Sequence, residues 1–226
     1  MGIMNAVFIA CMERILGLYS LAYEAAYPVV CYDERPCFLI GEAVEGIAPS
    51  PGKVAKEHYS YTKNGSCCLL AAIEPLTGKR VGQVQEQRTK KEYALFMQQL
   101  ARPYPTATKI RVVQDNLNTH NTSAFYEHLP AEEAFALAER FEFYYTPKSA
   151  SWLNMIEMEF SALAKGCLSQ RIPTKEELEK QVLTLLKERE DKQITIDWQF
   201  NLEKARTKLN RHYTKVNETN QKYKQT

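Results

Sequence analysis

Two kinds of hydrophobic pattern alternate along this chain. Short apolar runs bounded by turn residues predict strands, whereas apolar residues three and four positions apart predict helices. Residues 28–33 form a continuous apolar run that ends in Asp33, which is typical of a central strand covered on both faces. The other predicted strands cover residues 57–62, 66–74, 80–85, 109–114 and 141–145, and residues 36–40 begin either a further strand or a turn.

The helical segments begin at recognisable capping sequences. Thr89 with Glu92, and Thr174 with Glu177, have the spacing of a capping box, which predicts helices starting after each threonine. The first of these helices should end before Pro103. Further helices are predicted over residues 12–19, 122–128, 131–139, 152–168 and 202–213, with Pro- and Gly-rich turns at 46–52 and 75–78.

Three acidic residues stand where such elements begin or end. Asp33 ends the first predicted strand, Asp115 ends the strand over 109–114, and Glu157 lies on the helix predicted over 152–168. Carboxylates placed in this way can converge at one edge of a sheet, where their oxygens suit Mg²⁺ or Mn²⁺. A pair of such ions activates water or a hydroxyl group and stabilises a leaving oxygen during phosphoryl transfer.

The residues around these acids resemble the catalytic core of DDE transposases, in particular the mariner-like enzymes of bacterial insertion sequences. The resemblance rests on Val30–Glu34, Val113–His120, Tyr145–Lys148 and Leu153–Glu157, and it extends in order over roughly residues 10–215. In that family the last block reads Leu-Asn-Pro-Ile-Glu, and here Met155 replaces the proline without moving the acid out of register. With the order of elements, it predicts an RNase H-like α/β fold with a five-stranded mixed sheet flanked by helices.

The resemblance also implies an activity. A DDE transposase cuts DNA at transposon ends and joins the freed 3′ hydroxyl to target DNA, with Asp33, Asp115 and Glu157 holding two Mg²⁺ or Mn²⁺ ions. Because two ends are held together in transposition, a homodimer is expected. Such enzymes normally carry a helix-turn-helix DNA-binding region before the catalytic domain, and we expect it to be missing here or supplied separately. We therefore expect a lead-in helix in residues 1–26, a catalytic domain over 27–215 and a disordered tail over 216–226.

Helical geometry alone does not decide which residue is the third metal ligand. Glu157 and Glu159 flank the buried face of the same predicted helix, so either could reach a metal. The resemblance selects Glu157 and leaves Glu159 exposed or behind the ligands.

Several residues close to the acids in the sequence have two possible roles. Asn116 and Asn154 could brace carboxylates or touch DNA, and His120 could orient a group near the metals or cap and fill the core. Lys148 is a candidate phosphate contact, as are Lys165 and Arg171. Glu34, next to Asp33 on a strand, should point to the opposite face and be structural. Trp152 would either stack on a base or, by preference, anchor the helix start in the core.

The composition agrees with a DNA-binding enzyme without requiring one. The 226 residues carry a net charge of +2, with 15 Lys and Arg against 18 Asp and Glu over residues 1–159, and 14 against 9 over residues 160–226. A basic last third beside an acidic centre suits a DNA backbone lying across both, although a solvated helical surface gives the same pattern.

The six cysteines lack the spacing of a zinc site and predict reduced, mostly buried thiols in a cytoplasmic protein. The resemblance implies a bacterial enzyme that associates with the nucleoid when bound to DNA. The apolar stretch at residues 6–11 is too short for a membrane span. Two rival functions remain at this stage: an RNase H-like nuclease that only hydrolyses, and an inactive remnant that binds DNA or a partner.

Overall fold

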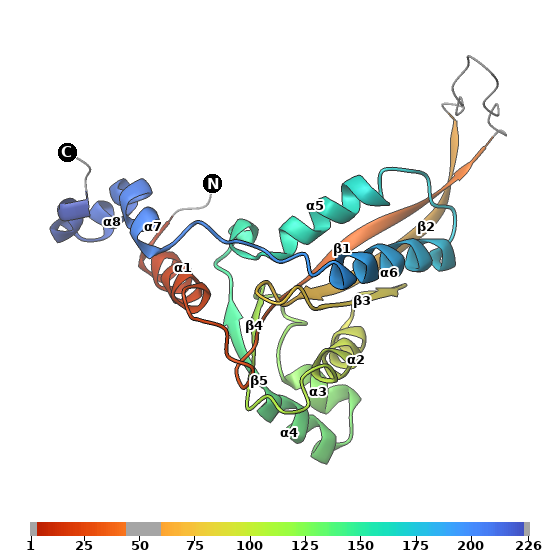
Figure 1. Ribbon diagram of the computed structural model, residues 1–226, viewed down its shortest axis with the longest axis horizontal. Coiled ribbons are helices and arrows are strands. Elements are labelled where there is room, and N and C mark those ends of the chain that lie inside the picture. Colours follow the sequence, from red (N-terminus) through yellow and green to blue (C-terminus); the bar gives the residue numbers. More distant parts are fainter. Residues whose placement is uncertain (1–3, 44–59, 224–226) are drawn as a thin grey trace.

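The computed structural model describes residues 4–43 and 60–223, and its centre is one mixed five-stranded sheet (Figure 1). The strand order is β3-β2-β1-β4-β5, with β1 antiparallel to β2, β2 antiparallel to β3, and β1, β4 and β5 parallel. The strands are β1 (Val29–Glu42), β2 (Tyr61–Ile73), β3 (Arg80–Gln85), β4 (Ile110–Gln114) and β5 (Phe141–Tyr145). The predicted five-stranded mixed sheet is therefore present.

Helices cover both faces of this sheet. They are α1 (Ala6–Tyr19), α2 (Lys90–Ala101), α3 (Ser123–His128), α4 (Ala131–Arg140), α5 (Ile156–Gly166), α6 (Lys175–Asp191), α7 (Leu202–Lys208) and α8 (Asn210–Val216). Helices α5 and α6 lie on one face, α2, α3 and α4 lie on the other, and α1 packs with α7 at one end of the molecule (Figure 1).

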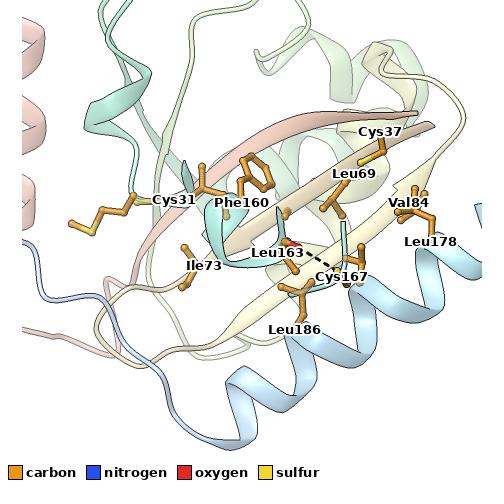
Figure 2. Close-up of a cluster of buried hydrophobic side chains, with 14 of the residues drawn as sticks. Cys31, Cys37, Leu69, Ile73, Val84, Phe160, Leu163, Cys167, Leu178 and Leu186 are labelled. Carbon is orange, nitrogen blue, oxygen red and sulfur yellow. Dashed lines mark hydrogen bonds between the residues drawn. The ribbon is translucent and has the colours of Figure 1, made fainter. Parts of the chain in front are cut away.

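The alternation of side chains along the strands separates two cores. Odd-numbered residues of β1 and β2, such as Cys31 and Leu69, pack against Phe160 and Leu163 of α5 and Leu186 of α6 (Figure 2). Even-numbered residues of the same strands face α2, α3 and α4. This period of two is what a strand covered on both faces requires, and it assigns Asp33 to the α5 side and Glu34 to the α2 side.

The first strand is longer than predicted. Residues 36–40, expected to begin another strand or a turn, continue β1 to Glu42 in pairing with β2. Proline interrupts central strands because it has no N–H, but β1 pairs with β4 only over Val29–Cys31. From there on no described strand pairs with this edge of β1, so Pro36 costs no ladder bond on that side. On the partner strand, Tyr61–Ile73 is continuous where two segments, 57–62 and 66–74, were expected.

Capping residues act largely as predicted. Thr89 and Glu92 form a complete capping box at α2, and the Thr174 hydroxyl accepts a hydrogen bond from the Glu177 N–H at the start of α6. The Glu177 carboxylate instead accepts from Gln181 Nε2 at 2.6 Å. The turn after β2 is also present, with Gly78 at a φ of 77°, where a side chain would be strained.

Two helical predictions were wrong in detail. The helix expected over 152–168 is split into a 3₁₀ turn, Ser151–Leu153, and α5, because Asn154 is extended. The helix expected over 202–213 breaks at Leu209, giving α7 and α8. Part of the tail expected to be disordered forms a 3₁₀ helix, Glu218–Tyr223, held by a hydrogen bond from Asn210 Nδ2 to the Asn220 carbonyl.

Some predictions fall outside the described residues, namely the loop at 46–52 and residues 57–59 of the next predicted strand. In the parts of the chain that are described, no helix has both the length and the apolar character needed to cross a membrane. All six cysteines are free thiols, and five of them are buried.

Candidate metal centre

Asp33 and Asp115 lie at the same level of two neighbouring parallel strands. Cys31 of β1 pairs with Val113 of β4, and each aspartate follows two residues later. Adjacent strands are about 4.8 Å apart, so this register brings the two carboxylates together at the C-terminal end of β4. Ligand sites of open α/β sheets form at such strand ends.

A buried amide positions the third acid. Asn154 Nδ2 donates to the Tyr32 carbonyl at 2.8 Å, and Asn154 is 1% exposed. This bond ties the start of α5 to β1 immediately before Asp33, and Glu157 lies in the first turn of α5. Asn154 is therefore buried and braces the backbone beside Asp33, not a carboxylate.

The charges of the three acids are coupled. Burial raises the pKa of Asp33, the Glu34 N–H lowers it through a hydrogen bond, and the negative charges of Asp115 and Glu157 raise it further, to about 7. The direction shows that both other carboxylates lie close enough to disfavour a negative charge on Asp33. A cation at this position would reverse that penalty.

His120 joins Asp115 to the opposite face of the sheet. Its Nδ1 lies 2.5 Å from Asp115 Oδ1 and its Nε2 lies 3.0 Å from Glu34 Oε1. Burial alone would lower the pKa of His120, but hydrogen bonds to Asp115 and Glu34 raise it to about 9. The imidazole is therefore a buried cationic link between two carboxylates.

Aromatic and amide groups fix this histidine. The Tyr93 ring stacks on the imidazole with centroids 4.9 Å apart, and Gln114 Nε2 donates to the His120 carbonyl at 3.0 Å. Glu34 also accepts a hydrogen bond from the Tyr32 hydroxyl at 3.0 Å. As predicted, Glu34 points away from Asp33 and is structural.

Glu159 does not occupy the position expected for it. Predicted to be exposed or behind the ligands, it is 1% exposed, and both carboxylate oxygens accept hydrogen bonds from Arg80 and Arg189 at 2.7–3.1 Å. Burial would raise the pKa of Glu159, but the two guanidinium groups lower it. A carboxylate with four such bonds has little lone-pair capacity left for a metal.

The remaining candidates lie at or near the surface. Asn116 and Lys148 are exposed. Trp152, expected by preference to be a buried anchor, is 40% exposed and meets Phe200 edge-on at 5.5 Å. Arg171 NH1 donates to the Ser60 carbonyl, so this guanidinium also supports the local backbone.

The three acids carry the oxygen atoms that a divalent cation binds, but their side chains do not converge as a complete set of metal ligands. In the described residues no group of three His, Cys, Asp or Glu side chains has metal-holding geometry. One physical reason is visible: Asp115 Oδ1 is engaged by His120. Carboxylate oxygens are nevertheless the ligand type that Mg²⁺ prefers.

Sequence patterns did not reveal the groups that support the acids. Tyr93, Gln114, Arg80 and Arg189 come from four different elements, and only the fold brings them to His120 and Glu159. A polar residue inside an apolar run, such as Gln114 in β4, is the one local signal of this network.

Comparison with known proteins identifies one family. The family described as DDE superfamily endonuclease matches residues 28–179. None of the curated proteins matches the chain.

Solved structures with the same fold are complexes of Mos1. The strand transfer complex of Mos1 superposes with a TM-score of 0.57 at 15% identity, covering 96% of this chain and 59% of that one. The Mos1 transposase paired-end complex with left transposon end and the mariner Mos1 paired-end complex with Mg each give 0.53 at 14%, covering 98% of this chain and 64% of theirs. The predicted RNase H-like fold is thereby confirmed, and the chain spans about three fifths of these Mos1 chains.

Proposed function

Since the chain belongs to the DDE superfamily endonucleases, we propose that it is the catalytic domain of a DNA transposase, which cleaves transposon ends and transfers the freed strand to target DNA. The observation that carries this proposal is the placement of three acids from separate elements. Asp33 and Asp115 lie at the same level of neighbouring strands, and Glu157 lies in the first turn of α5, which a buried hydrogen bond ties to β1. The likeness of fold to complexes described as strand transfer and paired-end complexes supports DNA as the substrate.

Asp33, Asp115 and Glu157 would hold the divalent cations, two ions of Mg²⁺ or Mn²⁺. When bound, these ions supply an activated water or hydroxyl and neutralise charge on the leaving oxygen. The relative whose structure is described with Mg supports this choice of ion.

Two buried residues, His120 and Asn154, would position the metal-binding acids. His120 holds the Asp115 carboxylate from one side, so that the other oxygen stays directed away from the imidazole. Asn154 fixes the start of α5 against β1 and with it the distance between Glu157 and Asp33. Lys148 and Asn116, both exposed, would contact the DNA backbone.

The partners follow from this activity. The enzyme would bind transposon ends and target DNA, and pairing of two ends calls for a homodimer. A separate helix-turn-helix region would recognise the end sequence, while residues 27–215 carry the catalysis. Such an enzyme would work in the bacterial cytoplasm, on nucleoid DNA.

The test is cleavage and joining of DNA. Supercoiled plasmid and labelled duplex are incubated with Mg²⁺ or Mn²⁺ and the unaltered chain, Asp115→Asn, Glu157→Gln, or Glu132→Gln as a control for the lost charge on exposed α4. We expect nicked and strand-joined products from the unaltered chain and the control, and at least a 100-fold loss in the other two. Joining that survives Asp115→Asn and Glu157→Gln would contradict the assignment, and cleavage without joining would indicate a nuclease.

A further inference from the structure

A polar pocket of about 340 Å³ lies on the α2 side of the sheet, next to the strands that carry the candidate metal ligands. Its lining consists of Glu34 of β1, Arg88 in the segment before α2, and residues 116–119 after β4. Glu34 directly follows Asp33, and Asn116 directly follows Asp115. The pocket therefore lies within one residue of each aspartate along the chain.

The loop after β4 is held through its backbone, which leaves its polar side chains available. The His120 N–H donates to the Leu117 carbonyl at 3.0 Å, and Asn121 Nδ2 donates to the Asn118 carbonyl at 2.7 Å. No hydrogen bond to a described residue is formed by the side chains of Asn116, Asn118 and Thr119. Amide and hydroxyl groups on a fixed backbone offer hydrogen-bond donors to a ligand.

Among the described residues that line this pocket, Arg88 is the only cation. Arg88 is exposed, and its guanidinium forms no ion pair or hydrogen bond with any described residue. Its basic neighbour Lys90 differs, because Lys90 Nζ pairs with Glu127 Oε1 at 2.5 Å. A guanidinium without a counter-charge suits a phosphate, whose oxygens it can bind through two parallel hydrogen bonds.

The one acid of the lining, Glu34, directs its charge into the protein. Its side chain is 3% exposed, and its Oε2 is buried. Its Oε1 accepts a hydrogen bond from the Tyr32 hydroxyl and lies 3.0 Å from His120 Nε2. A ligand in the pocket therefore meets the guanidinium of Arg88 and uncharged polar groups, and it reaches neither carboxylate oxygen of Glu34.

We propose that this pocket binds a backbone phosphate of the DNA substrate, with Arg88 as the charged contact and Asn118 and Thr119 as hydrogen-bond donors. The inference rests on the proposed transposase function and adds a second phosphate position beside the metal centre. A cavity of about 150 Å³ holds benzene, so this pocket has room for a phosphate with its sugar. Because such contacts fix the position of a strand without reading its sequence, Arg88 holds the DNA strand in place beside Asp33 and Asp115.

The experiment measures the affinity of the full chain for a short, fluorescently labelled DNA duplex by anisotropy at several salt concentrations, in EDTA. The variants are Arg88→Gln and the matched control Arg102→Gln, an exposed arginine at the other end of α2. We expect Arg88→Gln to lose about 5-fold in affinity at low salt and to lower the slope of log affinity against log salt by about 0.9, the value of one phosphate contact. The control should keep both the affinity and the slope.

A second variant tests whether the phosphate lies in this pocket. Asn118→Asp places a negative charge there and should weaken DNA binding about as much as Arg88→Gln does. Since both changes act on one phosphate, the double variant should lose less affinity than the product of the two separate losses. A double variant whose loss equals that product would overturn the shared site. Equal affinity and salt slope in Arg88→Gln and Arg102→Gln would overturn the contact itself.

The binding measurement separates this inference from the proposed function, because it requires no metal and no cleavage. Normal cleavage and joining by the unaltered chain, with no effect of Arg88→Gln on binding, would overturn the phosphate contact alone. An intact effect of Arg88→Gln on binding, with no cleavage by the unaltered chain, would overturn the proposed activity alone. Failure of the unaltered chain to bind duplex DNA at low salt would overturn both.

Discussion

Glu159 and Arg189 are joined by two parallel hydrogen bonds, from Nε to Oε1 at 2.7 Å and from NH2 to Oε2 at 3.0 Å. Arg80 approaches the same carboxylate in the same bidentate manner, with its side chain 1% exposed. This arrangement links β3, α5 and α6, and it separates the roles of two glutamates that are only two residues apart. Glu159 holds the helices to the sheet, and Glu157 is left for the metal centre.

Glu159→Gln should therefore be a stability variant. Removing the charge leaves Arg80 buried without a full counter-charge, and breaking a buried pair in this way costs about 3 kcal/mol. For a chain of this size, that corresponds to a fall in melting temperature of roughly 6–12 °C. Thermal denaturation followed by circular dichroism measures it. A melting temperature equal to that of the unaltered chain, together with lost Mn²⁺ binding, would make Glu159 a ligand instead.

The sequence predicted the neighbourhood of Asp33 and Asp115 better than the elements around them. The apolar runs before both acids predicted strands, and these strands are neighbours in the sheet, but Asp115 follows β4 whereas Asp33 lies within β1 and does not end it. The separation of Glu157 from Glu159 could not be read from helical periodicity, because both flank the same buried face. It depends on Arg80 and Arg189, which come from other elements and are visible only in the fold.

The predicted element boundaries were wrong where the tertiary structure overrides a local sequence rule. Pro36 ordinarily argues against a strand interior, yet it lies within β1 because the edge toward β4 is unpaired there. The helix predicted from Trp152 begins only at Ile156, because the side chain of Asn154 bonds to the Tyr32 carbonyl and holds its own backbone extended. Neither the unpaired edge at Pro36 nor the Asn154 hydrogen bond can be recognised from the neighbouring residues in the sequence.

Asp33→Asn should stabilise the metal-free protein at pH 8. The pKa of Asp33 is raised from 3.8 to about 7 in the folded state, so the folded chain keeps a proton that the unfolded chain loses. Its contribution to stability therefore falls as the pH rises from about 4 to 7, and the penalty is complete above pH 7. We expect a gain of about 1–2 kcal/mol at pH 8 and little gain at pH 4, measured by urea denaturation in EDTA. A loss of stability at pH 8 would contradict the assigned coupling.

His120→Phe should destabilise the metal-free protein in a pH-dependent way. The ring can still stack on Tyr93, but both hydrogen bonds are lost and Glu34 remains buried. The pKa of His120 is raised from 6.5 to about 9, so its charge-dependent stabilisation is fully present below about pH 6.5 and is lost as the pH rises through 9. We expect a cost of about 2 kcal/mol at pH 6 that shrinks by pH 9.5.

The control for this comparison is His128→Phe, at an exposed position of α3. Urea denaturation at the two pH values should show almost no change for it. An equal cost of His120→Phe at both pH values would mean that packing alone, and no charge, is lost.

Asn154→Ala should weaken both the fold and metal binding. The variant removes the bond to the Tyr32 carbonyl and leaves a buried carbonyl without its donor, at a cost of about 2 kcal/mol. Because the same bond positions Glu157, Mn²⁺ affinity should fall roughly 10-fold. Asn116→Ala, at an exposed position, should change stability by less than about 0.5 kcal/mol. Denaturation and Mn²⁺ titration are made on both variants, and normal Mn²⁺ affinity in Asn154→Ala would remove its positioning role.

We propose that Asp33, Asp115 and Glu157 form one divalent-metal centre. Titration with Mn²⁺ is the direct test of this proposal. Free Mn²⁺ is followed by electron paramagnetic resonance during titration of the unaltered chain, Glu157→Gln and the charge-matched control Glu132→Gln. We expect the unaltered chain and the control to bind Mn²⁺ with equal affinity and Glu157→Gln to lose at least 10-fold in Mn²⁺ affinity. Mn²⁺ binding by Glu157→Gln that equals the control would contradict it.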